Sequence, residues 1–174
     1  MIRDARETDL TEIVRIYNQA IPGREATADT APVTVESRRA WLVDRDARHP
    51  VWVYEQDGIV AAWLSLSKFY GRPAYGATVE VGIYVADSAQ GRGIARALLA
   101  AAIARAPALG ITTLLGFVFA HNLRSVALCE RFGFQRWGHL PRVAVLDGVE
   151  RDLLILGKRV EPGVPASPRL NQPG

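Results

Sequence analysis

Apolar and polar residues change their spacing several times along this chain, and each spacing predicts a different element. Residues 2–5 are expected to form a short first strand. From Leu10 to Ile21 apolar residues recur every three or four positions, which predicts an amphipathic helix. Asp9 and Glu12 are spaced as a capping box at the start of this helix. The next segment, 22–33, is a loop by composition.

A second helix is predicted from Thr34, a residue type that favours the N-cap position. Beyond it the spacing shifts to the two-residue period of β-strands, which predicts three strands at 51–54, 59–67 and 77–85. Asp57-Gly58 is a strong hairpin signal between the first two. In the third strand one face carries Val79, Val81, Ile83 and Val85, and the other carries Thr78, Glu80, Gly82 and Tyr84. A bulge in this strand would shift the alternation.

The second half of the chain alternates helices with strands. The spacing predicts a helix over 94–106, a strand over 111–119 and a helix from about Asn122 to Phe132. Two final strands, near 134–145 and 150–158, meet at Asp147-Gly148.

This order of elements predicts an α+β fold with a mixed, mostly antiparallel sheet and helices on both faces. It is not a Rossmann alternation, which argues against a dinucleotide site. With 174 residues, the chain is expected to be one domain over 1–160. The Pro-rich segment 161–174 is expected to be a flexible tail.

Composition and charge exclude several classes of protein. The net charge of +3 is mild and the arginines are scattered, so no nucleic-acid partner is expected. Cys129 is the only cysteine, which rules out an internal disulfide, and no Cys/His spacing indicates a metal site. Charges in the first ten residues and the absence of a long apolar run predict a cytoplasmic protein without a membrane partner.

The most unusual local sequence is a glycine-rich run, 90-QGRGIAR-96, that leads directly into a predicted helix. Amides at the start of a helix have no intrahelical acceptor and attract anions, and glycine lets a phosphate approach closely. Arg92 and Arg96 add positive charge there. The run lacks the Gly-Lys-Ser/Thr of a Walker A loop. The alternative is a plain turn with two incidental glycines.

Several motifs in order resemble the GNAT acetyltransferase superfamily. The run 90-QGRGIA-95 is similar to its pyrophosphate loop, 78-TVEVGIYV-85 to the strand before that loop, and 122-NLRSVALCERFGF-134 to its Asn-x-x-Ser…Gly-Phe segment. The segments 2–21 and 69–80 resemble the phosphinothricin and methionine sulfone N-acetyltransferase branch. The resemblance covers about residues 1–158.

The resemblance implies a sheet of about seven strands, splayed at the centre, with acetyl-CoA bound in the opening and no metal. It assigns contacts with the pantetheine arm to Ile83, Tyr84 and Val85 and to Asn122, although Asn122 could also be a simple N-cap. The implied pyrophosphate-binding residues are Gln90, Gly91, Arg92, Gly93, Ile94, Ala95 and Arg96.

Glu80 is the candidate catalytic base, because a carboxylate in an apolar strand beside the cofactor loop has the raised pKa that proton abstraction needs. The alternative is a half-exposed glutamate paired with an arginine. At the position where the family places a tyrosine or histidine as proton donor, this chain has Cys129. We expect Cys129 to be inert packing rather than the acid. His121, at a strand–helix junction, is assigned no role.

The resemblance also implies an acceptor pocket lined by Tyr70, Gly71, Arg72, Tyr75, Glu80, Val81 and Gly82, in which Arg72 would hold a carboxylate. A solvated loop arginine is the alternative for Arg72. The predicted function is acetyl transfer from acetyl-CoA to the α-amino group of a small amino acid or analogue, directly in a ternary complex, by a homodimer. Two alternatives stay open: a protein N-terminal or polyamine acetyltransferase, and a non-catalytic acyl-CoA-binding module.

Overall fold

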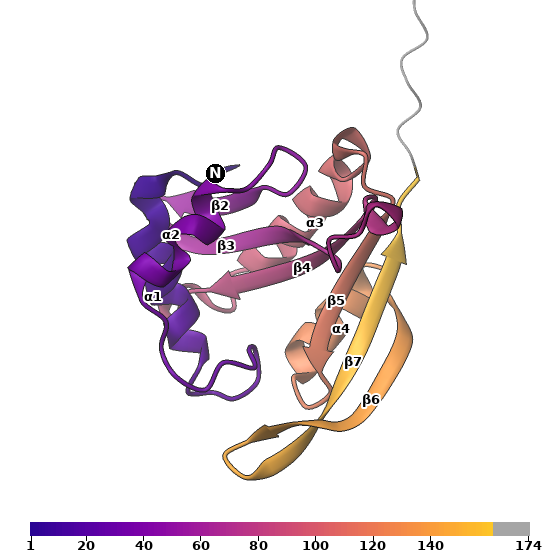
Figure 1. Ribbon diagram of the computed structural model, residues 1–174. Helices are drawn as coiled ribbons and strands as arrows, with labels where there is room; N and C mark the ends of the chain where they lie inside the picture. The colour runs from indigo at the N-terminus through magenta and orange to yellow at the C-terminus, as the bar shows by residue number, and fades with distance from the viewer. Residues whose placement is uncertain (162–174) are drawn as a thin grey trace, which may run out of the picture.

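The computed structural model describes residues 1–161 and shows one mixed sheet with helices on both faces (Figure 1). The strands follow the order β1-β2-β3-β4-β5-β7-β6. Their bounds are β1 Ile2–Asp4, β2 Val51–Gln56, β3 Ile59–Lys68, β4 Thr78–Val85, β5 Thr113–Phe119, β6 Gln135–Leu146 and β7 Val149–Arg159. The helices are α1 Leu10–Ala20, α2 Val35–Val43, α3 Ile94–Arg105 and α4 Leu123–Arg131. The α+β class and the predicted order of elements are confirmed.

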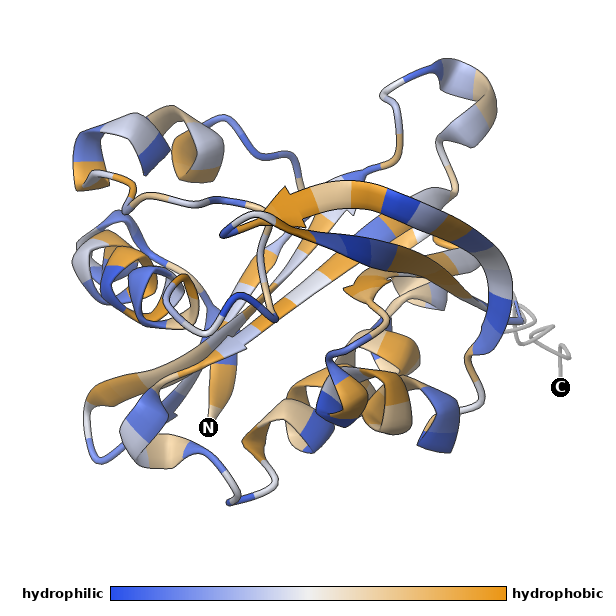
Figure 2. Cartoon of the chain, turned by 90° about the horizontal axis from the view of Figure 1, so that it is seen from below, coloured by the Kyte–Doolittle hydropathy of each residue, from blue (hydrophilic) through white to orange (hydrophobic). Residues whose placement is uncertain are grey.

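Helices α1 and α2 cover one face of the sheet, and α3 and α4 cover the other (Figures 1 and 2). On the first face the indole Nε1 of Trp63 in β3 donates to the carbonyl of Ile13 in α1, at 3.0 Å. On the second face Leu98 and Leu99 of α3 are fully buried with Leu64 and Val79 of the sheet. The apolar faces of α1 and α3 therefore pack on the sheet, as the spacing of their apolar residues predicts.

The neighbouring central strands β4 and β5 separate partway along their length. β3 and β4 pair without interruption from Ala62↔Val85 to Lys68↔Val79, so the strand carrying Glu80 has no bulge. β4 and β5 are parallel neighbours only at Thr78↔Thr113, Val79↔Leu114 and Glu80↔Leu115. Beyond Glu80 the two strands diverge, as Figure 1 shows. Glu80 thus lies at the vertex of an opening between two parallel strands, and the splay implied by the family resemblance is present.

Both predicted Asp-Gly hairpins form with the backbone that their sequence favours. Asp57 and Gly58 have φ of 52° and 77°, and Asp147 and Gly148 have 51° and 77°. Two consecutive residues with positive φ are the mark of a type I′ turn, whose twist matches that of antiparallel strands. These turns join β2 to β3 and β6 to β7.

The caps confirm two predictions and correct one. Thr34 Oγ1 accepts from the amide of Ser37 and Asn122 Oδ1 from that of Ser125, each at 3.1 Å, so both residues are N-caps. The capping box at Asp9 is wrong: the Asp9 carboxylate makes no cap bond to its helix. Arg3 binds it through two N–H groups, at 2.7 and 2.9 Å, and a bidentate ion pair is stronger than a bond to a neutral amide.

The C-terminal tail and membrane-spanning helices were the other two features considered in the sequence. Residues 162–174, nearly all of the expected tail, lie outside the described part of the chain. Within residues 1–161, none of the helices has both the length and the apolar character needed to cross a bilayer.

Candidate active site

The opening between β4 and β5 continues into a cavity of about 1010 Å³ that reaches both faces of the sheet. The carboxyl ends of the two strands flank it, and each is followed by a helix that begins at its edge: α3 after β4 and α4 after β5. On the α1 side the cavity is closed by the loop that joins α1 to α2, through residues 25–29. Clefts at the carboxyl ends of parallel strands are the usual place for a ligand in sheets of this kind.

The glycine-rich turn has the geometry of an anion site. Gly91 and Gly93 have φ of 75° and 77°, and no atom lies within 4 Å of where a Cβ would stand on either. Within residues 1–161 the amides of 91–96 donate to no carbonyl or side chain, because Gly93 is the N-cap of α3. These free amides form an anion-binding site at the N-terminus of a helix. The alternative of incidental glycines is disfavoured, since both hold a backbone conformation that L-residues rarely adopt.

Glu80 projects from the vertex of the splay into this cavity and into a smaller one beside it. In the described part of the chain its carboxylate has neither a hydrogen bond nor an ion pair, so the pairing with an arginine that was the alternative does not occur. The Glu80 side chain is exposed to the cavity, and the protein atoms around it displace enough water to raise the pKa of its carboxyl above its ordinary value. An unpaired carboxylate with a raised pKa is a candidate general base.

Aromatic side chains form the wall on the α1 side. The Tyr84 ring stacks on Trp63 with centroids 4.6 Å apart, and Tyr17 meets Tyr84 edge-on at 4.9 Å. The Tyr17 hydroxyl lies 2.6 Å from Thr27 Oγ1 and also donates to Asp29. Burial raises the pKa of Tyr17 and of Tyr84, so both phenols stay protonated. The Tyr84 hydroxyl donates to the carbonyl of Ala26 at 3.3 Å, so hydroxyl groups fix the loop between α1 and α2 to α1 and to the sheet.

Two residues at the start of α4 hold the same loop from the opposite side. Asn122, whose exposed fraction is 7%, donates from Nδ2 to the carbonyl of Glu25 at 3.2 Å. His121 Nε2 lies 2.7 Å from the carbonyl of Arg24, and its ring stacks on Phe119. His121 thus connects the end of β5 to the loop between α1 and α2. Asn122 lines the cavity as expected, and its capping role is real as well.

Cys129 lies on α4 and lines the cavity, with its Sγ 3.9 Å from the point where a Cβ on Gly116 would stand. Burial raises the pKa of its thiol to about 11. A half-buried, fully protonated thiol packed against a strand behaves as a small apolar side chain. This placement supports the inert role.

The structure gathers most of the predicted site residues around one cavity. Its lining includes the sequence-predicted residues Glu80, Val81, Gly82, Ile83, Tyr84, Val85, Gln90, Gly91, Gly93, Ile94, Ala95, Arg96 and Asn122. Arg92 is exposed and lies outside the lining.

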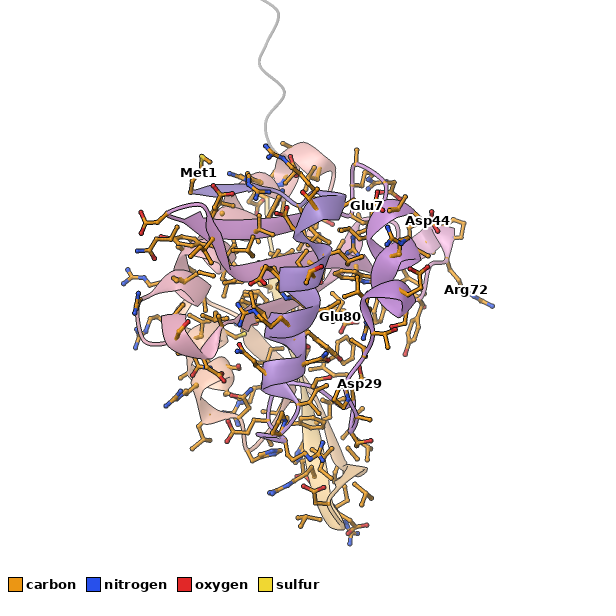
Figure 3. The ribbon with its side chains drawn as sticks, turned by 90° about the vertical axis from the view of Figure 1, so that its left-hand side faces the viewer. Met1, Glu7, Asp29, Asp44, Arg72 and Glu80 are labelled. Carbon is orange, nitrogen blue, oxygen red and sulfur yellow. The ribbon has the colours of Figure 1, made fainter. Side chains whose placement is uncertain are left out.

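The loop before β4 is the group that the structure does not bring in. Tyr70, Gly71, Arg72 and Tyr75 line neither cavity, and the exposed fraction of Tyr70 is 78%. Figure 3 shows Arg72 at the edge of the molecule, pointing away from Glu80. Within a single chain, this loop contributes no group to the vertex.

Sequence reasoning implied a pocket wall from the loop 26–34 without singling out Asp29, and it missed other lining residues, among them Tyr17, Arg38 and Arg124. Arg124 follows the Asn122 cap and donates to Gln90 Oε1 at 3.4 Å, which places a cation beside the glycine-rich turn. Its position on the first turn of a helix that opens at the cavity was the available signal. Arg38 and Asp29 gave none, because their place depends on how the α1–α2 loop folds back.

Among residues 1–161 no three His, Cys, Asp or Glu side chains are grouped closely enough to hold a metal ion. The groups that face the cavity are instead backbone amides, arginines, aromatic rings and the carboxylates of Glu25, Asp29 and Glu80. Such a set suits an elongated ligand with an anionic end and an uncharged arm along β4.

Comparison with known proteins agrees with this geometry. A model of the acetyltransferase (GNAT) family matches residues 10–134, well over half of the chain. YwnH of Bacillus subtilis strain 168, provisionally named a phosphinothricin acetyltransferase, is 45% identical over 160 residues, which cover 91% of this chain and 98% of YwnH. An L-methionine sulfoximine/L-methionine sulfone acetyltransferase of Pseudomonas paraeruginosa is 33% identical over 164 residues, which cover 92% of this chain and 95% of the Pseudomonas protein.

A solved structure gives the same result at the level of the fold. The crystal structure of a GNAT superfamily phosphinothricin acetyltransferase from Sinorhizobium meliloti, in complex with acetyl-CoA, superposes with a TM-score of 0.85 at 26% identity. The match covers 97% of this chain and 95% of that one.

Proposed function

The chain belongs to the GNAT acetyltransferase family, and on that premise we propose that it transfers the acetyl group of acetyl-CoA to the α-amino group of a small amino acid of the phosphinothricin or methionine sulfone type. The observation that carries the proposal is the unpaired Glu80 at the vertex of the β4–β5 opening, beside a turn of free amides. Both named relatives act, by their names, on amino-acid analogues of this size.

The residues present fit acetyl-CoA. The amides of 91–96, with Arg96 and Arg124 near them, would bind its pyrophosphate, and no Cβ on Gly91 or Gly93 blocks the approach. The backbone of Ile83, Tyr84 and Val85 has lost its β5 neighbour and can pair with the amide groups of the pantetheine arm. Asn122 has a side-chain amide at the same opening.

Acetyl-CoA supplies a thioester: the acceptor nitrogen forms a bond to its carbonyl carbon, and the C–S bond breaks. An α-amine is mostly protonated at neutral pH, so it must lose a proton before it attacks. Glu80 accepts that proton, directly or through one water, because its raised pKa lies nearer to neutrality than that of a solvated carboxylate. Both substrates occupy the cavity together, and no group of the chain is acylated.

The leaving thiolate takes its proton from solvent in this proposal. Cys129 lines the cavity, but its thiol has a pKa of about 11 and gives up a proton reluctantly. The absence of the family's usual donor is compatible with turnover, because a thiolate is a stable leaving group near neutral pH.

The test is release of CoA thiol from acetyl-CoA over a panel of amines. The panel contains methionine sulfone, methionine sulfoximine, phosphinothricin, unmodified amino acids, a polyamine and a peptide with a free N-terminus. Turnover confined to the amino-acid analogues supports the proposal. Preference for the peptide or the polyamine would favour the first alternative, and thermal stabilisation by acetyl-CoA without any turnover would favour the non-catalytic binding module.

Two further parts of the proposal concern the protein in the cell. We propose that the protein is a cytoplasmic homodimer, as the family resemblance implies. Its support is a set of exposed apolar side chains on the β6–β7 ribbon, which projects from the body of the molecule in Figure 1: Trp137, Val143, Val145 and Val149. The clamp assigned to Arg72 stays a prediction: Arg72→Ala should raise KM for an amino acid and leave KM for acetyl-CoA unchanged.

A further inference from the structure

A second cavity, of about 180 Å³, lies under α1 and α2 and opens beside Glu80. It shares Tyr17, Arg38, Glu80, Gly82 and Tyr84 with the larger cavity, so the two are continuous at the vertex. Figure 3 shows Glu80 facing the space between the two helices, with Asp29 at its edge. Any group bound here is on the opposite face of the sheet from the glycine-rich turn.

The walls of this small cavity are aromatic. Trp63 and Tyr84 form its floor on the sheet, and Trp41 of α2 meets Trp63 edge-on at 5.5 Å. An apolar cavity of about 150 Å³ is large enough for benzene. The volume here therefore accommodates a side chain of about six heavy atoms.

One hydroxyl that faces this cavity is open to a bound group. Ser65 has an exposed fraction of 6% and faces the cavity, and within residues 1–161 its Oγ makes no hydrogen bond. Ser67, two residues along β3, shows the contrast, because its Oγ accepts from Arg45 at 3.1 Å. A Cβ on Gly82 would come within 3.2 Å of Ser65 Oγ, so the glycine leaves room around the hydroxyl. A hydroxyl that lines a cavity without a protein partner can donate a hydrogen bond to a polar group bound there.

Arg38 provides the second polar group. Its guanidinium lies over the Tyr17 ring at 4.9 Å and donates through Nη2 to Asp29 at 3.2 Å. A guanidinium has five N–H donors, and within residues 1–161 the bond to Asp29 is the one that Arg38 makes, so donors remain for a group bound in the cavity that it lines. Arg39, the next residue, instead forms ion pairs with Glu36 and Glu7 on the outer side of α2.

We infer that this cavity holds the side chain of the acceptor, and that Arg38 and Ser65 select a side chain of about six heavy atoms ending in oxygen acceptors, such as a sulfone or a phosphinate. The inference rests on the proposed function. The aromatic walls take the methylene groups, and the two donors take the oxygens. A buried site that donates to oxygens discriminates strongly against a ligand that lacks them, because its donors are then left unpaired.

The experiment compares methionine sulfone with norleucine, whose side chain has no oxygen, as acceptors. In the Arg38→Met variant kcat/KM for methionine sulfone should fall about tenfold or more, through KM, while kcat/KM for norleucine changes less than about threefold. KM for acetyl-CoA should stay as in the wild type. Arg39→Met, on the same helix, is the matched control and should change neither ratio.

The outcomes separate the inference from the function beneath it. An equal loss for both acceptors in Arg38→Met, or none, would overturn the assignment while leaving the enzyme an amino-acid acetyltransferase. Wild-type protein that turns over neither acceptor, nor any amine of the panel, would sink the proposed function itself. Ser65→Ala gives an independent reading: it leaves α2 untouched, and it should lower the preference for methionine sulfone in the same direction.

Discussion

Glu80 has surroundings that leave its carboxylate without any partner. The surrounding protein atoms raise its pKa, and no cation among the described residues opposes the shift. Such a carboxyl is a working base only above its own pKa, so activity should be present at neutral pH and should fall as the pH drops through that raised value. A solvated glutamate would lose activity only at more acidic pH.

Replacing the carboxylate tests this directly. Glu80→Gln should lower kcat by about 10²–10⁴, the usual contribution of a general base, and should flatten the acidic limb of the pH profile. Steady-state thiol release across the acidic and neutral range measures both effects. A variant that retains kcat within about threefold, with the same acidic limb, would remove Glu80 from the chemistry.

The same shift makes a prediction about stability. The Glu80 carboxyl binds its proton more tightly in the folded state, so its contribution to the free energy of unfolding is present at low pH and lost as the pH rises through the folded value. At neutral pH Glu80→Gln should therefore keep or raise Tm. Glu55→Gln is the contrast, because Glu55 pairs with Arg3 at 2.6 Å and its loss should lower Tm.

Cys129 is the second residue whose role can be decided alone. Its thiol is protonated at neutral pH because burial raises the pKa to about 11, and it packs against β5. Cys129→Ala should keep most of the turnover, and the wild-type thiol should react slowly with an alkylating reagent. A fall in kcat of about a hundredfold would identify Cys129 as the proton donor instead.

At the scale of elements, the turn before α3 and the hairpin between β2 and β3 contain glycines in the same conformation. Gly93 and Gly58 both have φ of 77° and open space at the Cβ position. Alanine at either position costs about 1–2 kcal/mol of stability for a left-handed residue. Only Gly93 lines the cavity where a phosphate would approach.

Gly93→Ala should therefore raise KM for acetyl-CoA at least about tenfold, whereas Gly58→Ala should lose similar stability and leave that KM unchanged. Acceptor KM should stay the same in both variants. Tm and initial rates over a range of acetyl-CoA concentrations provide the measurements. Equal KM values for the two variants would mean that the turn does not hold the pyrophosphate.

The elements also show what local sequence determines. Helices, both Asp-Gly hairpins and the caps at Thr34 and Asn122 were predictable, because periodicity and turn chemistry act between near neighbours. Asp9 was not, since its partner Arg3 lies across a bend on another element. The small cavity could not be predicted for the same reason: Arg38 is one of two arginines on α2, and only the fold places it in the same cavity as Ser65.

At the scale of the whole molecule, the β6–β7 ribbon presents an apolar surface that one chain leaves uncovered. The exposed fractions of Trp137, Val143 and Val145 are 46%, 56% and 61%. Several large apolar side chains exposed on one hairpin are a candidate protein interface. The carried-over homodimer gives this surface an occupant, a second copy of the chain.

The prediction is a wild-type mass in solution of about 38 kDa, twice the 19.0 kDa of the chain, by light scattering on the eluted peak. Val145→Glu should shift the mass toward 19.0 kDa, because a charge in an apolar interface is costly to bury. Ile59→Glu, at 63% exposed and at the β2–β3 hairpin, away from the β6–β7 ribbon in the strand order, is the control and should remain a dimer. A mass of 19.0 kDa for the wild-type protein would exclude the homodimer. A dimer that survives Val145→Glu but not Ile59→Glu would show that the interface lies near the β2–β3 hairpin instead of the β6–β7 ribbon. Since the ribbon also lines the cavity through Val143 and Leu153, dissociation of a true dimer at this surface should reduce kcat/KM as well as mass.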